Sequence, residues 1–155
     1  MTDPILKAQL VRDEGRDNKS YLDSEGFWTV GIGHYLGLER RILWLTDEEV
    51  EAFYTADVAE AMAIVFNIWP ELGAREGKSF ELWADANGPV YRALVNMAFN
   101  LGETKLREFK KFRAAVSAYN WNTAAVEMMD SKWAKQVGAR ATRLRDQIRT
   151  GKDVV

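Results

Sequence analysis

The chain has 155 residues, no Cys and a single His, which excludes disulfides and thiolate chemistry and argues against a zinc site. It contains no run of about 18 apolar residues, which excludes a membrane-spanning helix, and its first residues lack the blocks of a secretory signal. The net charge of −2 is unevenly divided: residues 1–102 hold 9 Lys and Arg against 17 Asp and Glu, and residues 103–155 hold 12 against 6. The basic half is either a solvated helical surface or a face attracted to an anionic polymer.

The first predicted helix begins at Asp3-Pro4, because Asp caps helices and Pro suits the first helical position. It continues to Glu14, and Gly15 then follows, as is typical of a helix end. An acid is therefore expected at the C-terminal end of this helix.

A second acid, Asp23, opens the turn Asp-Ser-Glu-Gly between two apolar pairs. Thr29 then starts a glycine-rich strand over residues 29–33, which we expect to end at His34 within a hairpin reaching about Tyr35. Two acids and a hydroxyl presented in this way could surround one site. Spacing alone leaves open an ordinary surface turn rich in acids.

A long amphipathic helix is predicted from the capping box of Thr46 and Glu49 to Trp69-Pro70. Asp57 interrupts its apolar face, and an acid at such a position needs a partner or stays protonated. We predict an ion pair between Asp57 and His34 that clamps the strand to the helix. Stability is then expected to fall at alkaline pH as His34 loses its proton, and at acid pH as Asp57 gains one.

The remaining chain is predicted to be helical, apart from a loop over residues 71–87 with a helical turn near 80–83. The predicted helices span residues 90–101, 105–119, 122–129 and 139–150, with Gly102 ending the first of them. Trp133 is expected to pack just after the third. The predicted class is α+β and mostly helical: a small N-terminal β lobe, a long connecting helix and an all-helical C-terminal lobe.

The spacing of Glu14, Asp23 and Thr29, followed by Gly-Ile-Gly-His, resembles the phage lysozymes of glycoside hydrolase family 24. Four further blocks are similar to that family in order and spacing: residues 45–62, 93–104, 131–133 and 140–151. The resemblance implies one lysozyme-like two-lobe domain over residues 1–155. It implies an N-terminal lobe over about 13–56, a connecting helix over about 47–69 and a C-terminal lobe over about 70–155, on which helix 3–13 packs.

The resemblance also implies an activity. The chain would be a muramidase that cleaves the β-1,4 bond between N-acetylmuramic acid and N-acetylglucosamine in peptidoglycan, with inversion and without a cofactor or metal. Glu14 matches the general acid that protonates the glycosidic oxygen. Asp23 and Thr29 match the pair that holds the attacking water on the opposite face of the sugar.

Supporting roles follow from the same resemblance. Arg140 matches an arginine that packs against the catalytic Glu, and the pair of His34 and Asp57 matches a salt bridge of the family. The expected substrate-binding residues are Gly33, Tyr35, Phe99 and Asn100. Phe112 and Glu127 depart from the family pattern. At these two positions the family has small or amide side chains that face the substrate.

Two other functions remain as alternatives. A lytic transglycosylase needs a Glu but no placed water, so Asp23 and Thr29 argue against it. An inactive wall-binding or virion structural module would not need all three residues. We expect a monomer that binds peptidoglycan, binds no nucleic acid and does not insert into membranes. We expect it to wait in the host bacterial cytoplasm until its release to the wall, or to be virion-associated if it is a domain of a tail protein.

Overall fold

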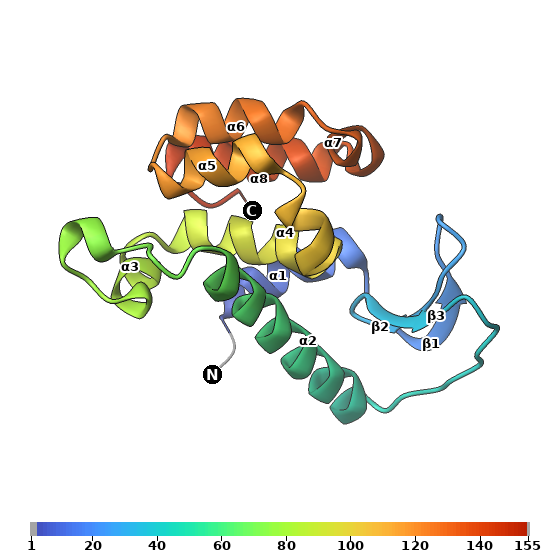
Figure 1. Cartoon of the computed structure of the whole chain (residues 1–155). Helices are drawn as coiled ribbons and strands as arrows, with labels where there is room; N and C mark the ends of the chain where they lie inside the picture. The colour runs from blue at the N-terminus through green and yellow to red at the C-terminus, as the bar shows by residue number, and fades with distance from the viewer. Residues whose placement is uncertain (1–2, 155) are drawn as a thin grey trace. The chain divides into compact units, whose positions relative to one another are not determined.

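The computed structural model describes residues 3–154 (Figure 1). Within these residues the chain forms one helix, then a three-stranded sheet, and then only helical elements. In chain order the elements are α1 Pro4–Glu14, β1 Asp17–Leu22, β2 Trp28–Gly31, β3 His34–Gly37, α2 Asp47–Ile68, the 3₁₀ turn η1 Ala74–Glu76, α3 Phe80–Ala86, α4 Gly88–Arg107, α5 Lys110–Ser117, α6 Trp121–Met129, α7 Lys132–Val137 and α8 Ala139–Thr150.

The chain divides into two compact units, one ending at Glu60 and the next beginning at Ala61, so the boundary lies inside α2. The first unit holds α1 and the whole sheet, and the second unit is helical. The predicted α+β, mostly helical class is confirmed. The finer lobe boundaries stay a prediction. Across residues 3–154, no helix combines the length and apolar character needed to cross a bilayer.

The ends of α1 are those predicted from the sequence. The Asp3 carboxylate accepts hydrogen bonds from two N–H groups of the first turn at 2.9 and 3.1 Å, and Pro4 takes the first helical position. Gly15 ends the helix with φ of +79°, a value that favours glycine. Glu14 is therefore the last residue of the helix.

The sheet has the order β1-β2-β3, with both strand pairs antiparallel. The prediction that His34 ends the glycine-rich strand is wrong: β2 ends at Gly31, and His34 begins β3. Gly31 and Gly33 both have φ of +65°, so the chain leaves the extended conformation and turns between them. The predicted hairpin is therefore a three-stranded meander that reaches Gly37.

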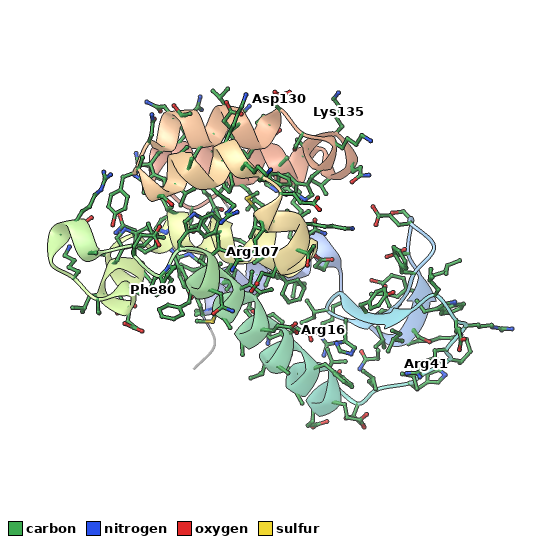
Figure 2. The ribbon with its side chains drawn as sticks, in the orientation of Figure 1. Arg16, Arg41, Phe80, Arg107, Asp130 and Lys135 are labelled. Atoms are coloured by element: carbon green, nitrogen blue, oxygen red, sulfur yellow. The ribbon has the colours of Figure 1, made fainter. Side chains whose placement is uncertain are left out.

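The sheet packs against the first turns of α2. A β carbon built on Gly31 would lie 3.4 Å from Val50 Cγ1, and the His34 ring lies 4.2 Å, centroid to centroid, from that of Phe53. Arg16, labelled in Figure 2, adds a hydrogen bond of 3.1 Å to Asp47 Oδ1. These contacts fix the sheet on the helix that follows it in the chain.

The start of α2 is also the predicted one. The backbone N–H of Glu49 donates to Thr46 Oγ1 at 3.1 Å, and the Thr46 hydroxyl donates to Glu49 Oε1 at 3.3 Å. The predicted cap at Thr46 is thus confirmed, with the Glu49 carboxylate accepting from the Thr46 hydroxyl and not from its backbone N–H. Helix α2 runs from there to Ile68, just before Trp69-Pro70.

In the second unit, α4 supplies the centre of the core. Its apolar residues are buried on most sides, and α8 packs against both α4 and α6, as Figure 1 shows. Gly102 interrupts α4 with φ of +75° and ψ of +169°, at the position where the sequence predicts a helix end. A short helical segment continues beyond this kink to Arg107.

One predicted helix of the helical unit is wrong. The helix predicted over 105–119 is two helices, because Phe109 has ψ of +65° and separates Arg107 from Lys110. The Phe109 ring instead contacts that of Trp133 at 6.1 Å, a tertiary contact that local periodicity does not encode.

Helix α3 is longer than the sequence predicts, and α7 was not predicted at all. Residues 80–86 form a helix where one turn was predicted, and residues 132–137 form a helix that was not predicted. Each begins with a Ser cap, Ser79 or Ser131, whose hydroxyl accepts a backbone N–H three residues on. Phe80 of α3, labelled in Figure 2, packs edge-on against Phe66 of α2.

Candidate active site

The side chain of Glu14 lies directly against the backbone of the β2–β3 turn. A β carbon built on Gly33 would be 2.9 Å from Cβ, Cγ and Oε2 of Glu14. Glu14 Oε1 is shielded from solvent. The absence of a side chain at residue 33 therefore makes room for the acid at the end of α1.

Tyr21 connects the two candidate acids. Its hydroxyl donates to the main-chain oxygen of Glu14 at 3.3 Å. Burial raises the pKa of the Tyr21 phenol, and the charges of Glu14, Asp17 and Asp23 raise this pKa further. The geometric link is the hydrogen bond to the Glu14 main chain, while Asp23 follows Tyr21 by two residues in the chain.

Asp23 and Thr29 meet at the backbone of Phe27. The N–H of Phe27 donates to Asp23 Oδ1 at 2.8 Å, and its C=O accepts from the N–H of Asp23 at 2.8 Å and from Thr29 Oγ1 at 3.4 Å. The N–H of Glu25 also donates to Asp23 Oδ1, at 2.9 Å. One carboxylate oxygen therefore orders the turn, and within residues 3–154 no hydrogen bond reaches the other oxygen, Oδ2.

Aromatic side chains flank Thr29 across the sheet. Thr29 is paired with Tyr21 on β1 and with Tyr35 on β3. Residues directly opposite each other in antiparallel strands project from the same face, so the three side chains share one face. Tyr35 is 60% exposed, and its ring meets that of Phe27 edge-on at 5.4 Å. An exposed aromatic surface thus lies beside the buried threonine.

The predicted contact between His34 and Asp57 is confirmed. The distance from His34 Nδ1 to Asp57 Oδ2 is 2.7 Å, and the side chains are 23% and 22% exposed. His34 begins β3 immediately after Gly33. The pair therefore connects the turn at Gly33, which lies against Glu14, to helix α2. The supporting role predicted for the pair stays a prediction.

The other predicted site residues lie in the second unit. Arg140 is buried, and its Nε donates to Oδ1 of the buried Asn96 at 2.9 Å. Asn100 Oδ1 accepts a hydrogen bond of 2.7 Å from Trp133 Nε1, and Phe99 is half-buried on α4. The supporting role predicted for Arg140 and the substrate-binding roles predicted for Phe99 and Asn100 stay predictions.

Phe112 departs from the family pattern for a reason that the structure explains. It is among the most fully buried side chains, and its ring packs edge-on against Trp69 and Phe109. It therefore serves the core of the second unit.

The sequence analysis missed Tyr21, Phe27 and Asn96. Tyr21 lies two residues before Asp23 in the chain. This spacing does not predict that the Tyr21 hydroxyl donates to the Glu14 carbonyl. Phe27 acts through its backbone, which carries no residue-specific signal. Asn96 was detectable, because a single amide inside a helix that is otherwise apolar needs a polar partner.

Comparison with known proteins identifies the family. The family model described as "Phage lysozyme" matches residues 11–149, a span that includes Glu14, Asp23 and Thr29. The chain belongs to the phage lysozyme family. It is accordingly a glycoside hydrolase, a muramidase-type peptidoglycan hydrolase.

Similar proteins include relatives of the chain's own size and much longer phage proteins. "Probable T4-type lysozyme 2" of Dictyostelium discoideum is 26% identical over 94% of this chain and 94% of its own length. "Pre-baseplate central spike protein Gp5" of Enterobacteria phage T4 is 29% identical over 94% of this chain but 28% of its own length. "Peptidoglycan hydrolase gp36" of Pseudomonas phage phiKMV is 26% identical over 87% of this chain and 14% of its own length.

Proposed function

We propose that this phage lysozyme hydrolyses the β-1,4 bond between N-acetylmuramic acid and N-acetylglucosamine with inversion at the anomeric carbon. In this proposal Glu14 is the general acid, and Asp23 and Thr29 place the attacking water. The main support is geometric: the Glu14 side chain lies against the turn at Gly33, and Tyr21, which bonds to the Glu14 main chain, is paired with Thr29 on the sheet.

Glu14 suits the role of a positioned acid. Its backbone is held by Tyr21, and its side chain is confined by the turn at Gly33. A carboxyl fixed in this way can transfer its proton to the glycosidic oxygen as the bond to the leaving sugar breaks. Such proton transfer typically contributes about a hundredfold to ten-thousandfold in rate.

Asp23 and Thr29 can orient one water through two acceptors. The Thr29 hydroxyl hydrogen is directed at the Phe27 carbonyl, so Oγ1 offers lone pairs to a water. Asp23 Oδ1 is occupied by the turn, whereas Oδ2 can accept a second hydrogen of that water. The lone pair of the water then attacks the anomeric carbon while Asp23 takes its proton. Inverting enzymes separate the two carboxyls by about 6.5–9.5 Å to fit this water.

Sugar contacts are proposed for the remaining residues. The exposed ring of Tyr35 beside Thr29 offers an apolar face to a pyranose ring. Gly33, Phe99 and Asn100 keep the substrate-binding roles implied by the family resemblance. Arg140 keeps the supporting role implied by the family resemblance.

The test is a set of conservative substitutions assayed on purified peptidoglycan by release of soluble muropeptides. We expect Glu14→Gln to lose at least a hundredfold in rate while its circular dichroism spectrum is unchanged. Asp23→Asn should also lose activity. Glu25→Gln is the matched control, because Glu25 is an exposed acid on the same turn. A Glu14→Gln protein as active as the wild type would remove the assignment.

Two product analyses test the chemistry. Mass spectrometry of the muropeptides should find reducing ends, whereas anhydro-muramic ends would mean a lytic transglycosylase. Proton NMR of a fresh digest should find the α-anomer first, because inversion of a β bond yields that anomer. Early appearance of the β-anomer would overturn inversion.

For the place of action, we propose phage-driven lysis by an enzyme released from the host cytoplasm to the wall. Similarity to a lysozyme along 94% of both chains supports the released enzyme, which we propose acts as a monomer. Similarity to a baseplate spike protein supports the virion-borne alternative. Mass spectrometry of purified virions should fail to find the chain, whereas its recovery in stoichiometric amount would favour that alternative.

A further inference from the structure

We propose that Tyr21 is a positioning residue of the reaction, which holds the acid at the end of α1 in register with the hydroxyl of Thr29 on the sheet. The inference rests on the roles proposed for Glu14, Asp23 and Thr29. It adds a residue whose side chain need not touch the substrate.

One end of the link is the C-terminus of α1. The last carbonyls of an α-helix receive no hydrogen bond from an N–H group of the same helix and need donors from elsewhere. The Glu14 carbonyl accepts the Tyr21 hydroxyl at 3.3 Å, a hydrogen bond that passes from β1 to α1. The phenol therefore ties down the residue whose side chain is the candidate acid.

The other end of the link is the central strand. Tyr21 is the register partner of Thr29, and opposed side chains in an antiparallel pair have β carbons about 4.5–5.5 Å apart. Two residues beyond Tyr21 the chain reaches Asp23, whose turn is bonded to the backbone of Phe27. One side chain thus couples the acid to the elements that carry both water-placing groups.

The Tyr21 phenol is un-ionised at neutral pH like any tyrosine, and its surroundings extend that state toward alkaline pH. Glu14 on α1, Asp17 on β1 and Asp23 on the following turn all oppose ionisation of Tyr21, and burial opposes it more strongly. The neutral phenol retains the O–H that the Glu14 carbonyl accepts. The hydrogen bond is therefore kept across the neutral pH range.

The first test is Tyr21→Phe, with kcat and KM measured on soluble peptidoglycan fragments. A shift of the acid by about 1 Å can cost up to a hundredfold. We expect kcat to fall about tenfold and KM to change less than about twofold. Tyr54→Phe is the matched control: it removes a buried phenol hydroxyl of the same unit, for which no hydrogen-bond partner exists among residues 3–154. The control should keep the wild-type kcat.

The outcomes separate the possible roles of Tyr21. An unchanged kcat in Tyr21→Phe would overturn the proposal, and so would a fall equal to that of Tyr54→Phe. A rise in KM at constant kcat would mean a substrate contact and would also overturn it. If Glu14→Gln is inactive while Tyr21→Phe is fully active, the proposed function stands and only the role of Tyr21 fails.

A second readout does not need activity. Tyrosine labelled at Cζ can be titrated by NMR, with the Tyr21 resonance assigned by its loss in Tyr21→Phe. Glu14→Gln and Asp23→Asn should each lower the pKa of this phenol, because each removes a nearby negative charge. Glu25→Gln should leave it unchanged. No response to either of the first two substitutions would place the phenol away from the acids and overturn the proposal.

Discussion

Gly33 lies against Glu14 without room for a side chain, because a β carbon at residue 33 would come within 2.9 Å of three atoms of the acid. Its φ of +65° adds a second reason for glycine. The two reasons have different consequences. A side chain at any glycine of positive φ lowers stability, whereas a side chain at residue 33 would also displace Glu14.

We predict that Gly33→Ala displaces the Glu14 side chain and lowers muropeptide release at least tenfold. It should also cost about 1–3 kcal/mol in the free energy of unfolding, through strain and overpacking. The measurements are the muropeptide assay and urea unfolding.

Gly77→Ala is the control for this substitution. Gly77 has φ of +66°, nearly that of Gly33, but a β carbon there meets no atom within 4 Å. It should lose about 1 kcal/mol of stability and no activity. Equal activity in the two alanine variants would show that the contact with Glu14 has no effect on the chemistry.

We predict that His34 and Asp57 are energetically coupled. A double-mutant cycle with His34→Asn and Asp57→Asn should yield about 1–2 kcal/mol of coupling in the free energy of unfolding, because both side chains are largely shielded. The pair of Lys78 and Glu76, 42% and 37% exposed, serves as the control and should yield less than about 0.5 kcal/mol. Coupling no larger than in the control would contradict a clamp between β3 and α2.

We predict that Tyr54 makes stability fall at alkaline pH. Burial, with Asp3 and Glu51 contributing less, raises the pKa of Tyr54 to about 12, above the value near 10 of an unfolded chain. A raised pKa stabilises the fold below pH 10, and this stabilisation is lost as the pH rises through 10 to 12. Relative to Tyr54→Phe, the wild type should lose about 2 kcal/mol between pH 9 and pH 12.

Guanidinium unfolding across this pH range measures the effect. Tyr35→Phe, which removes an exposed phenol, should follow the wild-type curve. If the curves of the wild type and Tyr54→Phe run parallel, the Tyr54 phenol has the same pKa in the folded and unfolded protein, and the prediction is wrong.

We predict that Asn100 stabilises the second unit through Trp133. In Asn100→Ala the indole N–H, on a side chain only 5% exposed, loses its acceptor, which should cost about 1–3 kcal/mol of unfolding free energy. Asn100→Asp keeps an oxygen acceptor and should recover most of this stability. If Asn100 also binds substrate through its amide N–H groups, Asn100→Asp will raise KM. Thermal melts that do not distinguish Asn100→Ala from the wild type would contradict the structural role.

Helix ends were predictable where the signal is local. The caps at Asp3 and Thr46 each act over about four residues, and both are present as predicted. Local signals also predicted the helix end at Glu14 and the turn at Asp23.

Other features depend on residues that are distant in sequence. The break at Phe109 accompanies its contact with Trp133, and the start of β3 at His34 accompanies the pairing with Asp57 on α2. Periodicity and propensity describe one segment at a time, so they extended the helix through Phe109 and the strand through Gly33.

The sequence by itself determined the residues available for the chemistry and most helix ends, because caps and turns are satisfied by neighbours in the chain. Only the tertiary structure decided that Tyr21 holds the Glu14 carbonyl and that Gly33 makes room for the Glu14 side chain. Those contacts exist only after α1 and the sheet have packed together, since each joins atoms from separate elements.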